Sequence, residues 1–113
     1  MILKANKSVE GYTTINVPLE DIYSKRDQAA IMDPKFVASL HQSLDENGME
    51  YPVILRDGAE ENTGSLYACW IGNNRIHYAK ERGYTHIAGI LAETITDKRN
   101  IFHITNMEYC KDF

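Results

Sequence analysis

The stretch YACWIGNNRIHYAKERGY, residues 67–84, constrains the fold more than any other part of the chain. Its first five residues read as a buried strand. From residue 73 onward the apolar positions have the spacing of an amphipathic helix, which Gly83 is expected to end. Only Gly72 stands between the two patterns. The sequence therefore predicts a strand that turns directly into a helix at a glycine.

Helix signals are strongest in the segment 33–47. Asp33 is placed as the N-cap, Pro34 occupies the first turn, and Gly48 follows as the stop. A second, shorter helix is predicted over PLEDIY, residues 18–23, because proline is favoured at the first helical position. The helix after the corner is predicted to extend over residues 72–83.

Strand signals alternate with these helices. They are TTINV at 13–17, YPVIL at 51–55, SLYACWI at 65–71 and HIAGILAE at 86–93, with the second and third expected to form a hairpin. The order predicts an α+β fold with a small mixed β-sheet and packed helices. We expect a single domain over residues 1–113, with its core over about 14–91. The structure after residue 92 is left open between a strand at IFHIT and a terminal helix.

Composition excludes several classes of protein. No run approaches the roughly 18 apolar residues of a membrane span, and the first residues lack the continuous apolar stretch of a secretion signal. The expectation is a soluble cytoplasmic protein without a membrane partner. Twelve basic and sixteen acidic side chains give a formal charge of -4, so a DNA-coating surface is not expected. Cys69 and Cys110 lack metal-ligand spacing and are predicted to be free thiols.

The corner has the chemistry of an anion site. The first N–H groups of a helix lack intrahelical acceptors and lie at the positive end of the helix dipole, which favours phosphate. Gly72 would admit a ligand close to the backbone, Asn73 could cap the helix, and Arg75 supplies a charged fork. The same four residues would also suit a corner that binds no ligand, with glycine for a tight turn, asparagine for capping and an arginine on the surface. The four residues leave both interpretations open.

A family resemblance favours the first interpretation. WIGNNRIHYAKERGYTHIAGIL resembles the segment of ParB/sulfiredoxin-like domains in which a strand leads into a G-x-x-R box, a helix, a glycine and a final strand. INVPLEDI is similar to the opening strand of that family, and SKRD to its basic element. DPKFVASLHQSLDENGMEYPVIL resembles the helix that ends before its next strand. The resemblance covers roughly residues 14–91.

The resemblance implies a phosphate pocket. Gly72, Asn73, Asn74 and Arg75 would form its phosphate end, and Arg26, with Lys25, would supply positive charge from the other side. A nucleoside triphosphate accompanied by Mg²⁺ is the implied ligand. Sulfiredoxins have GCHR at this box and ParB proteins have GERR. Asn73 provides no thiolate, so sulfiredoxin activity is not expected, and the missing glutamate and arginine leave CTP selectivity unassigned.

Several other residues are candidates for chemistry. Glu20 could act as the base of a nucleotide-dependent kinase, and Asp57 with Glu60 and Glu61 could hold the metal of a ParB-like nuclease. Four aromatic residues and one histidine could reach a bound base: Tyr67, Trp70, Tyr78, Tyr84 and His77. The ordinary alternatives to these roles are a solvated acidic loop for the carboxylates and core packing for the aromatic side chains.

The sequence therefore predicts a ParB/sulfiredoxin-like domain that binds a nucleotide or another phosphate-bearing ligand at the GNNR corner. The alternatives are a metal-dependent nuclease or nucleotide-dependent kinase, and a non-catalytic adaptor that binds a protein partner. Whether the protein is an enzyme is left open. The small format suggests a phage protein. Any binding of nucleic acid is expected to be weak, through a small patch around Arg26, Arg75 and Arg82.

Overall fold

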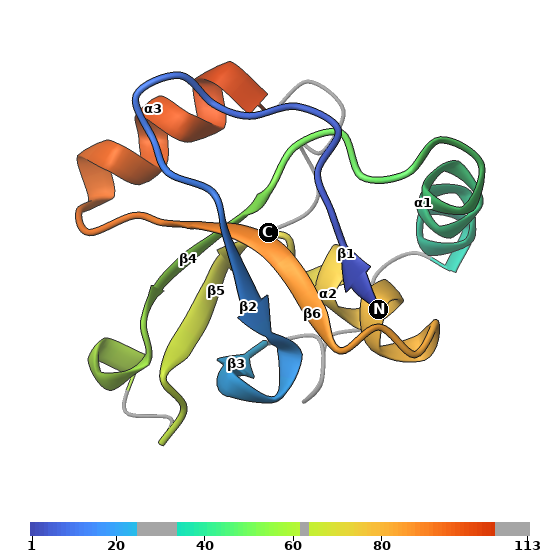
Figure 1. Ribbon diagram of the computed structural model, residues 1–113, viewed down its shortest axis with the longest axis horizontal. Coiled ribbons are helices and arrows are strands. Elements are labelled where there is room, and N and C mark those ends of the chain that lie inside the picture. Colours follow the sequence, from blue (N-terminus) through green and yellow to red (C-terminus); the bar gives the residue numbers. More distant parts are fainter. Residues whose placement is uncertain (25–33, 62–63, 106–113) are drawn as a thin grey trace.

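A mixed sheet of six strands forms the centre of the molecule (Figure 1). The computed structural model describes residues 1–24, 34–61 and 64–105. The sheet order is β1-β6-β4-β5-β3, and β2 also pairs with β6. The β1–β6, β4–β6 and β3–β5 pairs are parallel, whereas β2–β6 and β4–β5 are antiparallel. The strands are β1 Ile2–Leu3, β2 Ile15–Pro18, β3 Ile22–Tyr23, β4 Val53–Asp57, β5 Tyr67–Ile71 and β6 His86–Leu91.

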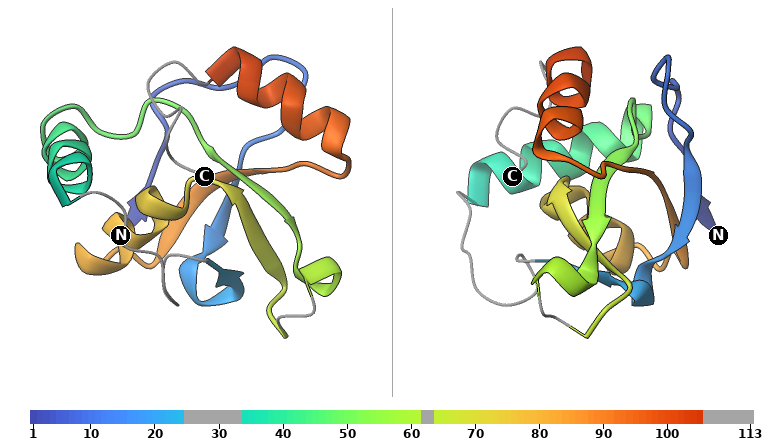
Figure 2. Two further views of the ribbon diagram at one scale, coloured as in Figure 1. Left: turned by 180° about the vertical axis from the view of Figure 1, so that it is seen from behind. Right: turned by 90° about the vertical axis from the view of Figure 1, so that its left-hand side faces the viewer.

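The helices cover both faces of this sheet. They are α1 Pro34–Asn47, α2 Asn73–Glu81 and α3 Ile95–Thr105, with short 3-10 turns η1 Leu19–Asp21 and η3 Gly58–Glu61. Figure 1 shows α3 at the upper left, apart from α1 and α2 at the right, and Figure 2 gives the same arrangement from behind and from one side. The predicted α+β fold with a mixed sheet and packed helices is confirmed.

Alternation along β4 divides the core into two clusters. Val53 and Leu55 are buried with residues of α1 and α2, whereas Ile54, between them, is buried with Ile101 of α3. Successive side chains of a strand point to opposite faces, so α3 covers the face opposite to α1 and α2. β4 can be apolar at all three positions because both of its faces are covered.

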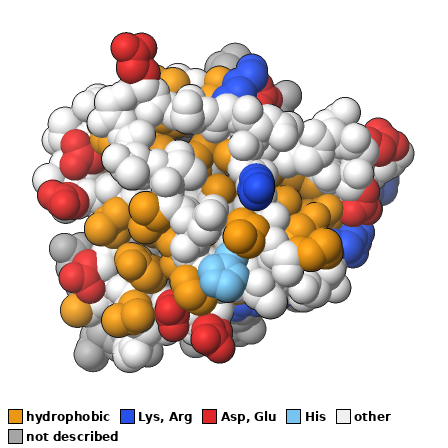
Figure 3. Space-filling model, viewed as in Figure 1, with side chains coloured by type: hydrophobic (Ala, Val, Ile, Leu, Met, Phe, Trp, Pro, Cys, Tyr) orange, Lys and Arg blue, Asp and Glu red, His pale blue; other side chains and the backbone are white. Residues whose placement is uncertain are grey.

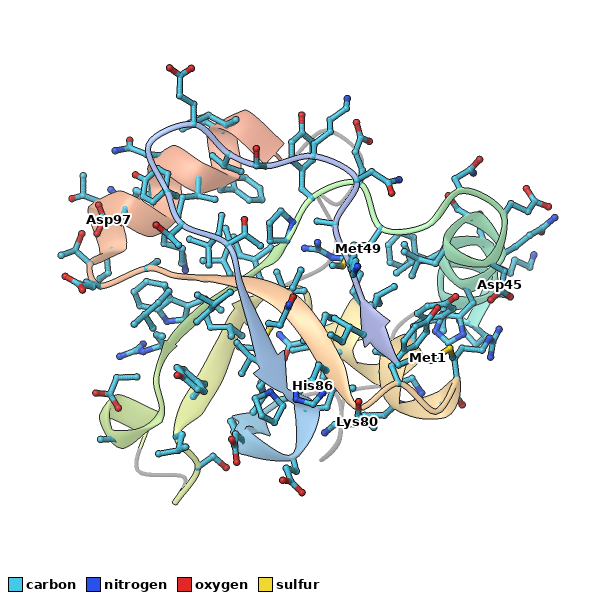
Figure 4. All side chains as sticks on the ribbon, in the orientation of Figure 1. Met1, Asp45, Met49, Lys80, His86 and Asp97 are labelled. Carbon is cyan, nitrogen blue, oxygen red and sulfur yellow. The ribbon has the colours of Figure 1, made fainter. Side chains whose placement is uncertain are left out.

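Two local predictions are corrected. The segment 18–23 is not a helix throughout: Pro18 ends β2, a single 3-10 turn follows, and Ile22 already belongs to β3. The segment after residue 92 contains α3, so of the two alternatives left open there the helix is confirmed and the strand at IFHIT is wrong. Thr94 starts this helix, because its Oγ1 accepts the N–H of Asp97 at 3.0 Å. Figure 4 shows Asp97 on this helix.

The first residues also belong to the packed structure. β1 pairs in parallel with His86 and Ile87 of β6, and Ala5 bridges to Met49 beyond the end of α1. Val9 is buried in the cluster under α3. The packed core therefore extends before residue 14, and through α3 it extends beyond residue 91. None of the described helices is both long and apolar enough to span a bilayer.

A polar contact joins α1 to α2. The Asp45 carboxylate accepts the Tyr78 hydroxyl at 2.8 Å and two guanidinium bonds from Arg82 at 3.0 and 2.9 Å. Asp45 lies on α1 at the right of Figure 4. These hydrogen bonds, above all those from Arg82, lower the pKa of Asp45 to about 2.

Acid should weaken this contact, and Asp45→Asn should remove that part of the pH dependence. The folded-state pKa lies below the ordinary value of 3.8, so the contact stabilises the fold above about pH 4 and is lost as the pH falls towards 2. Urea unfolding between pH 6 and pH 2.5 should show Asp45→Asn less stable than the wild type at pH 6 and less acid-sensitive. Glu46→Gln, one residue further on α1, is the matched control. Equal acid sensitivity in Asp45→Asn and the wild type would contradict the prediction.

Candidate functional site

The predicted corner lies between β5 and α2. β5 ends at Ile71, α2 begins at Asn73, and Gly72 is the single residue between them. Its φ of 118° and ψ of 19° place it in the left-handed region, which glycine adopts without a steric penalty. The strand-to-helix turn predicted from the sequence is therefore present.

Gly72 is also required by packing. A Cβ at this position would lie 2.5 Å from Cγ1 and 2.8 Å from Cβ of Val53, which is on the neighbouring strand β4. Real Cβ atoms do not approach other carbons so closely. The side chain of Val53 thus occupies the space beside Gly72 through which a ligand was expected to reach the backbone. A ligand at this corner would have to approach from the helix N-terminus.

The start of α2 presents its backbone donors at that point. The first intrahelical bond joins the N–H of Ile76 to the carbonyl of Gly72 at 2.9 Å. The N–H groups of the three preceding residues therefore have no acceptor within the helix. α2 has nine residues, and its dipole places partial positive charge at this end. An anion is the ligand class that this end of a helix favours.

Asn73 has a different role from the predicted one. Gly72 is the N-cap, and no side chain caps α2, so the expectation that Asn73 caps the helix is wrong. Its amide oxygen Oδ1 instead accepts the hydroxyl of Ser24 at 2.8 Å. Both residues are buried, with 3% and 1% of their surface exposed. The bond connects the residue after β3 to the first residue of α2.

Arg75 is buried with 2% of its surface exposed, so the alternative of an arginine on the surface is excluded. Its Nη1 donates to the backbone carbonyl of Tyr51 at 2.8 Å, and Nη2 lies 3.2 Å from the point that a Cβ of Gly72 would occupy. The guanidinium is therefore held directly beside the corner. This hydrogen bond orients the guanidinium, whose charge is permanent. Asn74, between Asn73 and Arg75, is buried as well.

The other predicted site residues lie either outside the described residues or away from the corner. Lys25 and Arg26 lie outside the described residues, as do Asp33 and Cys110. The side chains of Glu60 and Glu61 also lie outside them. Asp57 accepts the N–H of Ala59 at 2.9 Å, as expected of a turn. Among the described side chains, no group of three His, Cys, Asp or Glu residues could hold a metal ion.

Glu20 lies near the opposite end of α2. It lines a cavity of about 340 Å³ together with Tyr84, Thr85 and His86, all of which follow α2. A helix of nine residues is about 13 Å long. Glu20 is thus poorly placed to act as a base on a ligand bound at Gly72.

The candidate aromatic and histidine side chains have partners elsewhere. Tyr78 is buried and donates to Asp45. The Trp70 ring contacts two cations, with Arg56 at 4.6 Å and Lys98 at 5.1 Å from its centre. His77 lies 3.6 Å from Glu81, one turn further along α2. Tyr67 and Tyr84 pack partly buried against the core.

Cys69 is a small buried core residue, as the sequence predicts. It belongs to β5, has 5% of its surface exposed and forms no disulfide. It packs in the cluster beneath α1 and α2. Burial among apolar side chains disfavours a reactive thiolate.

Known structures share this fold. A sulfiredoxin from Arabidopsis thaliana superposes with a TM-score of 0.57 and 17% identity, covering 79% of this chain and 94% of that one. A C-terminally truncated chromosome-partitioning protein ParB from Caulobacter crescentus, complexed with CTP-γ-S, superposes with a TM-score of 0.60 and 20% identity. The match covers 85% of this chain and 53% of that one. A Pnob8-like ParB-N domain superposes with a TM-score of 0.53 and 16% identity, covering 79% of this chain and 33% of that one.

These likenesses concern the fold, because all three identities lie below 25%. The chain spans about half of the Caulobacter ParB fragment and a third of the Pnob8-like chain. A search of curated protein sequences gives no match. The model of the ParB N-terminal domain family, however, matches residues 3–107, which is nearly the whole chain. With the fold and the G-x-x-R corner in agreement, the chain belongs to the ParB N-terminal domain family.

Proposed function

We propose that this domain binds a phosphate-bearing ligand, with a nucleoside triphosphate as the first candidate, at the Gly72–Arg75 corner. The observation that carries the proposal is the buried guanidinium of Arg75 beside the N-terminus of α2. The helix dipole and a permanent side-chain charge act at the same place. Together they favour an anion more strongly than either does alone.

The choice of a nucleotide rests on family membership. The Caulobacter ParB of similar fold was obtained with the nucleotide analogue CTP-γ-S. By the same analogy, Lys25 and Arg26 are proposed to contribute positive charge, and Mg²⁺ to accompany a triphosphate as it does at many nucleotide sites. The base that the site prefers is not assigned, because Asn73 and Asn74 replace the glutamate and first arginine of the ParB box.

Binding without an assigned reaction is the best-supported function. The kinase alternative needs a base near the phosphates, and Glu20 lies towards the far end of α2. The nuclease alternative needs a metal near Asp57, Glu60 and Glu61, and the side chains of Glu60 and Glu61 lie outside the described residues. The remaining alternative is an adaptor that binds a protein partner, and the ligand experiment below separates it from the proposal.

Binding of nucleic acid is proposed to be weak. Of the three arginines expected to form a basic patch, Arg75 is buried and Arg82 forms its bonds with Asp45. On the face drawn in Figure 3, Lys and Arg side chains are scattered and acidic side chains occupy much of the rim. A protein that neutralises few phosphates gains little from counterion release, so its affinity is low and depends only shallowly on salt.

Calorimetric unfolding with a ligand panel tests the proposed function. The panel is CTP, ATP, GTP and UTP with and without Mg²⁺, the four nucleosides, and inorganic triphosphate. A ligand present at about 100 times its dissociation constant should raise the free energy of unfolding by about 2.7 kcal/mol. We expect this from at least one nucleotide, a smaller shift from inorganic triphosphate, and none from the nucleosides.

Two outcomes would contradict the proposal. Equal stabilisation by a nucleotide and its nucleoside would show that the phosphates are not recognised. No stabilisation by any phosphate-bearing compound would favour the adaptor.

A further inference from the structure

The contact between α1 and α2 places two histidines around one carboxylate. Nδ1 of His41, on α1, lies 3.5 Å from Oε2 of Glu81, on α2. Nε2 of His77, one turn earlier on α2, lies 3.6 Å from Oε1 of the same carboxylate. The centres of the two imidazole rings are 6.0 Å apart. Histidine is the side chain whose charge ordinarily changes between about pH 5 and pH 8, so the contact between these helices includes a group that can titrate near neutrality.

His41 is enclosed more fully than His77. Its side chain is 12% exposed, against 31% for His77, and its ring lies edge-on to Tyr78 with the ring centres 5.3 Å apart. Nε2 of His41 is buried and has no hydrogen-bond partner among the described residues. In the charged ring this nitrogen would carry an N–H and part of a positive charge, and burying those without an acceptor costs more than burying a bare nitrogen. The surroundings of His41 therefore favour the neutral ring.

The charged groups that face His41 act in both directions. Two carboxylates, Glu81 of α2 and Asp45 of α1, favour a positive ring. Arg82 and a protonated His77, both on α2, oppose it. Each carboxylate is also engaged elsewhere, because Asp45 accepts two bonds from Arg82 and Glu81 lies beside His77. Burial has the largest effect, and it lowers the pKa of His41 below the ordinary value of 6.5.

We infer that His41 makes the attachment of α1 to α2 sensitive to pH, so that α1 stays attached at neutral pH and detaches more readily in mild acid. The inference does not depend on the proposed function. α1 lies at the outside of the molecule beside α2 (Figure 1), and of its 14 residues only Leu40 and Leu44 are buried. Elements with few buried apolar side chains are the ones that open locally. One unfavourable charge next to Leu40 is therefore large relative to what holds this helix.

The direction of the effect follows from proton uptake. The His41 ring takes up its proton at a lower pH when α1 is attached than when the ring is in water. Its contribution to the attachment is therefore present above about pH 6.5 and is lost as the pH falls below that value. For one proton the equilibrium between attached and detached α1 changes by at most about tenfold per pH unit. Asp45, whose pKa is about 2, stays charged throughout this range.

Amide hydrogen exchange measured by NMR at pH 7.5 and pH 5.5, corrected for the intrinsic pH dependence of exchange, tests the inference. At both pH values the α1 amides should be less protected than those of β4, because α1 can open while the sheet stays folded. Protection in α1 should fall several-fold on acidification of the wild type. In His41→Phe, which keeps a ring against Tyr78 but cannot gain a proton, most of that fall should disappear. His103→Phe, at an exposed histidine of α3, is the matched control and should behave as the wild type does.

Three results would overturn the inference. The first is protection in α1 equal to that in β4, which would mean that α1 opens only when the whole molecule unfolds. The second is an equal fall of α1 protection in the wild type and His41→Phe. The third is a fall that persists in His41→Phe and disappears in His77→Gln, which would assign the pH dependence to the other histidine. If His41→Phe does not fold, His41→Gln replaces it and must likewise remove most of the fall. No ligand is used, so none of these results bears on the proposed function.

Discussion

Gly72→Ala is expected to be the most destabilising substitution at the corner, lowering the free energy of unfolding by roughly 2–6 kcal/mol. Two causes add. A φ of 118° is strained for a residue with a side chain, at about 1–3 kcal/mol. The new Cβ would also meet Val53 Cγ1 at 2.5 Å, and relieving such overpacking costs about 1–3 kcal/mol more. Urea unfolding measures the loss.

Gly83→Ala is the control that separates the two causes. Gly83 also has a positive φ, 79°, but a Cβ there would meet nothing within 4 Å. Its replacement should cost only the backbone part, about 1–2 kcal/mol. Val53→Ala should partly rescue Gly72→Ala because it removes the methyl groups that obstruct the new Cβ. Equal losses at Gly72 and Gly83, with no rescue, would show that Val53 does not constrain the corner.

The corner was predictable because its signals are local. A run of apolar residues, one glycine and a helical pattern occupy consecutive positions, and together they predict the turn at Gly72. The clash with Val53 was not predictable in this way. It depends on β4, nineteen residues earlier in sequence, lying beside β5, and the periodicity of one segment does not report such pairing.

The same distinction explains the error about Asn73 and why Arg75 was left between two interpretations. An asparagine at the start of a helix usually indicates a cap, and an arginine usually lies on the surface. Here Ser24 and the carbonyl of Tyr51 bind these side chains, and both partners are distant in sequence. Which residues at the corner are buried is therefore a property of the tertiary structure.

The segment of α3 was left open between a strand and a helix for a different reason, because its local signal was present but weak. Thr94 followed by Asp97 is the spacing of an N-terminal capping pair, and the structure uses Thr94 in that way. The helix contributes few fully buried side chains, with Ile101 at its centre, so its apolar periodicity is shallow. Without strong periodicity, the β-branched residues in IFHIT were compatible with a strand.

Asn73→Asp is expected to cause the largest loss of ligand affinity among variants that still fold. The carboxylate has nearly the shape of the amide and can accept the same bond from Ser24. Negative charge at a helix N-terminus is favourable, and both interactions favour the ionised form. Burial opposes these two interactions, because Asn73 is only 3% exposed and a carboxylate loses its hydration there. We therefore expect the variant to fold, with a lower free energy of unfolding than the wild type.

Phosphate binding should be weakened directly by the new charge. The aspartate would place a negative charge where the proposed ligand brings several of its own. Two like charges about 4 Å apart repel by about 4 kcal/mol at the effective dielectric of a protein surface. A loss of affinity for inorganic triphosphate of more than about a hundredfold is expected by titration calorimetry, since each 1.4 kcal/mol is about tenfold.

Asn100→Asp, on α3, makes the same change in net charge on the helix that packs against the opposite face of the sheet. It should leave the affinity for triphosphate close to that of the wild type, because Asn100 is exposed and a solvated charge on that helix is screened by water and salt. Arg75→Ala is a less clear test, because removing a buried guanidinium also leaves the Tyr51 carbonyl without its partner. A folded Asn73→Asp variant that still binds triphosphate as the wild type does would show that the phosphates lie elsewhere. Loss of binding in Asn73→Asp but not in Asn100→Asp would place them at the N-terminus of α2.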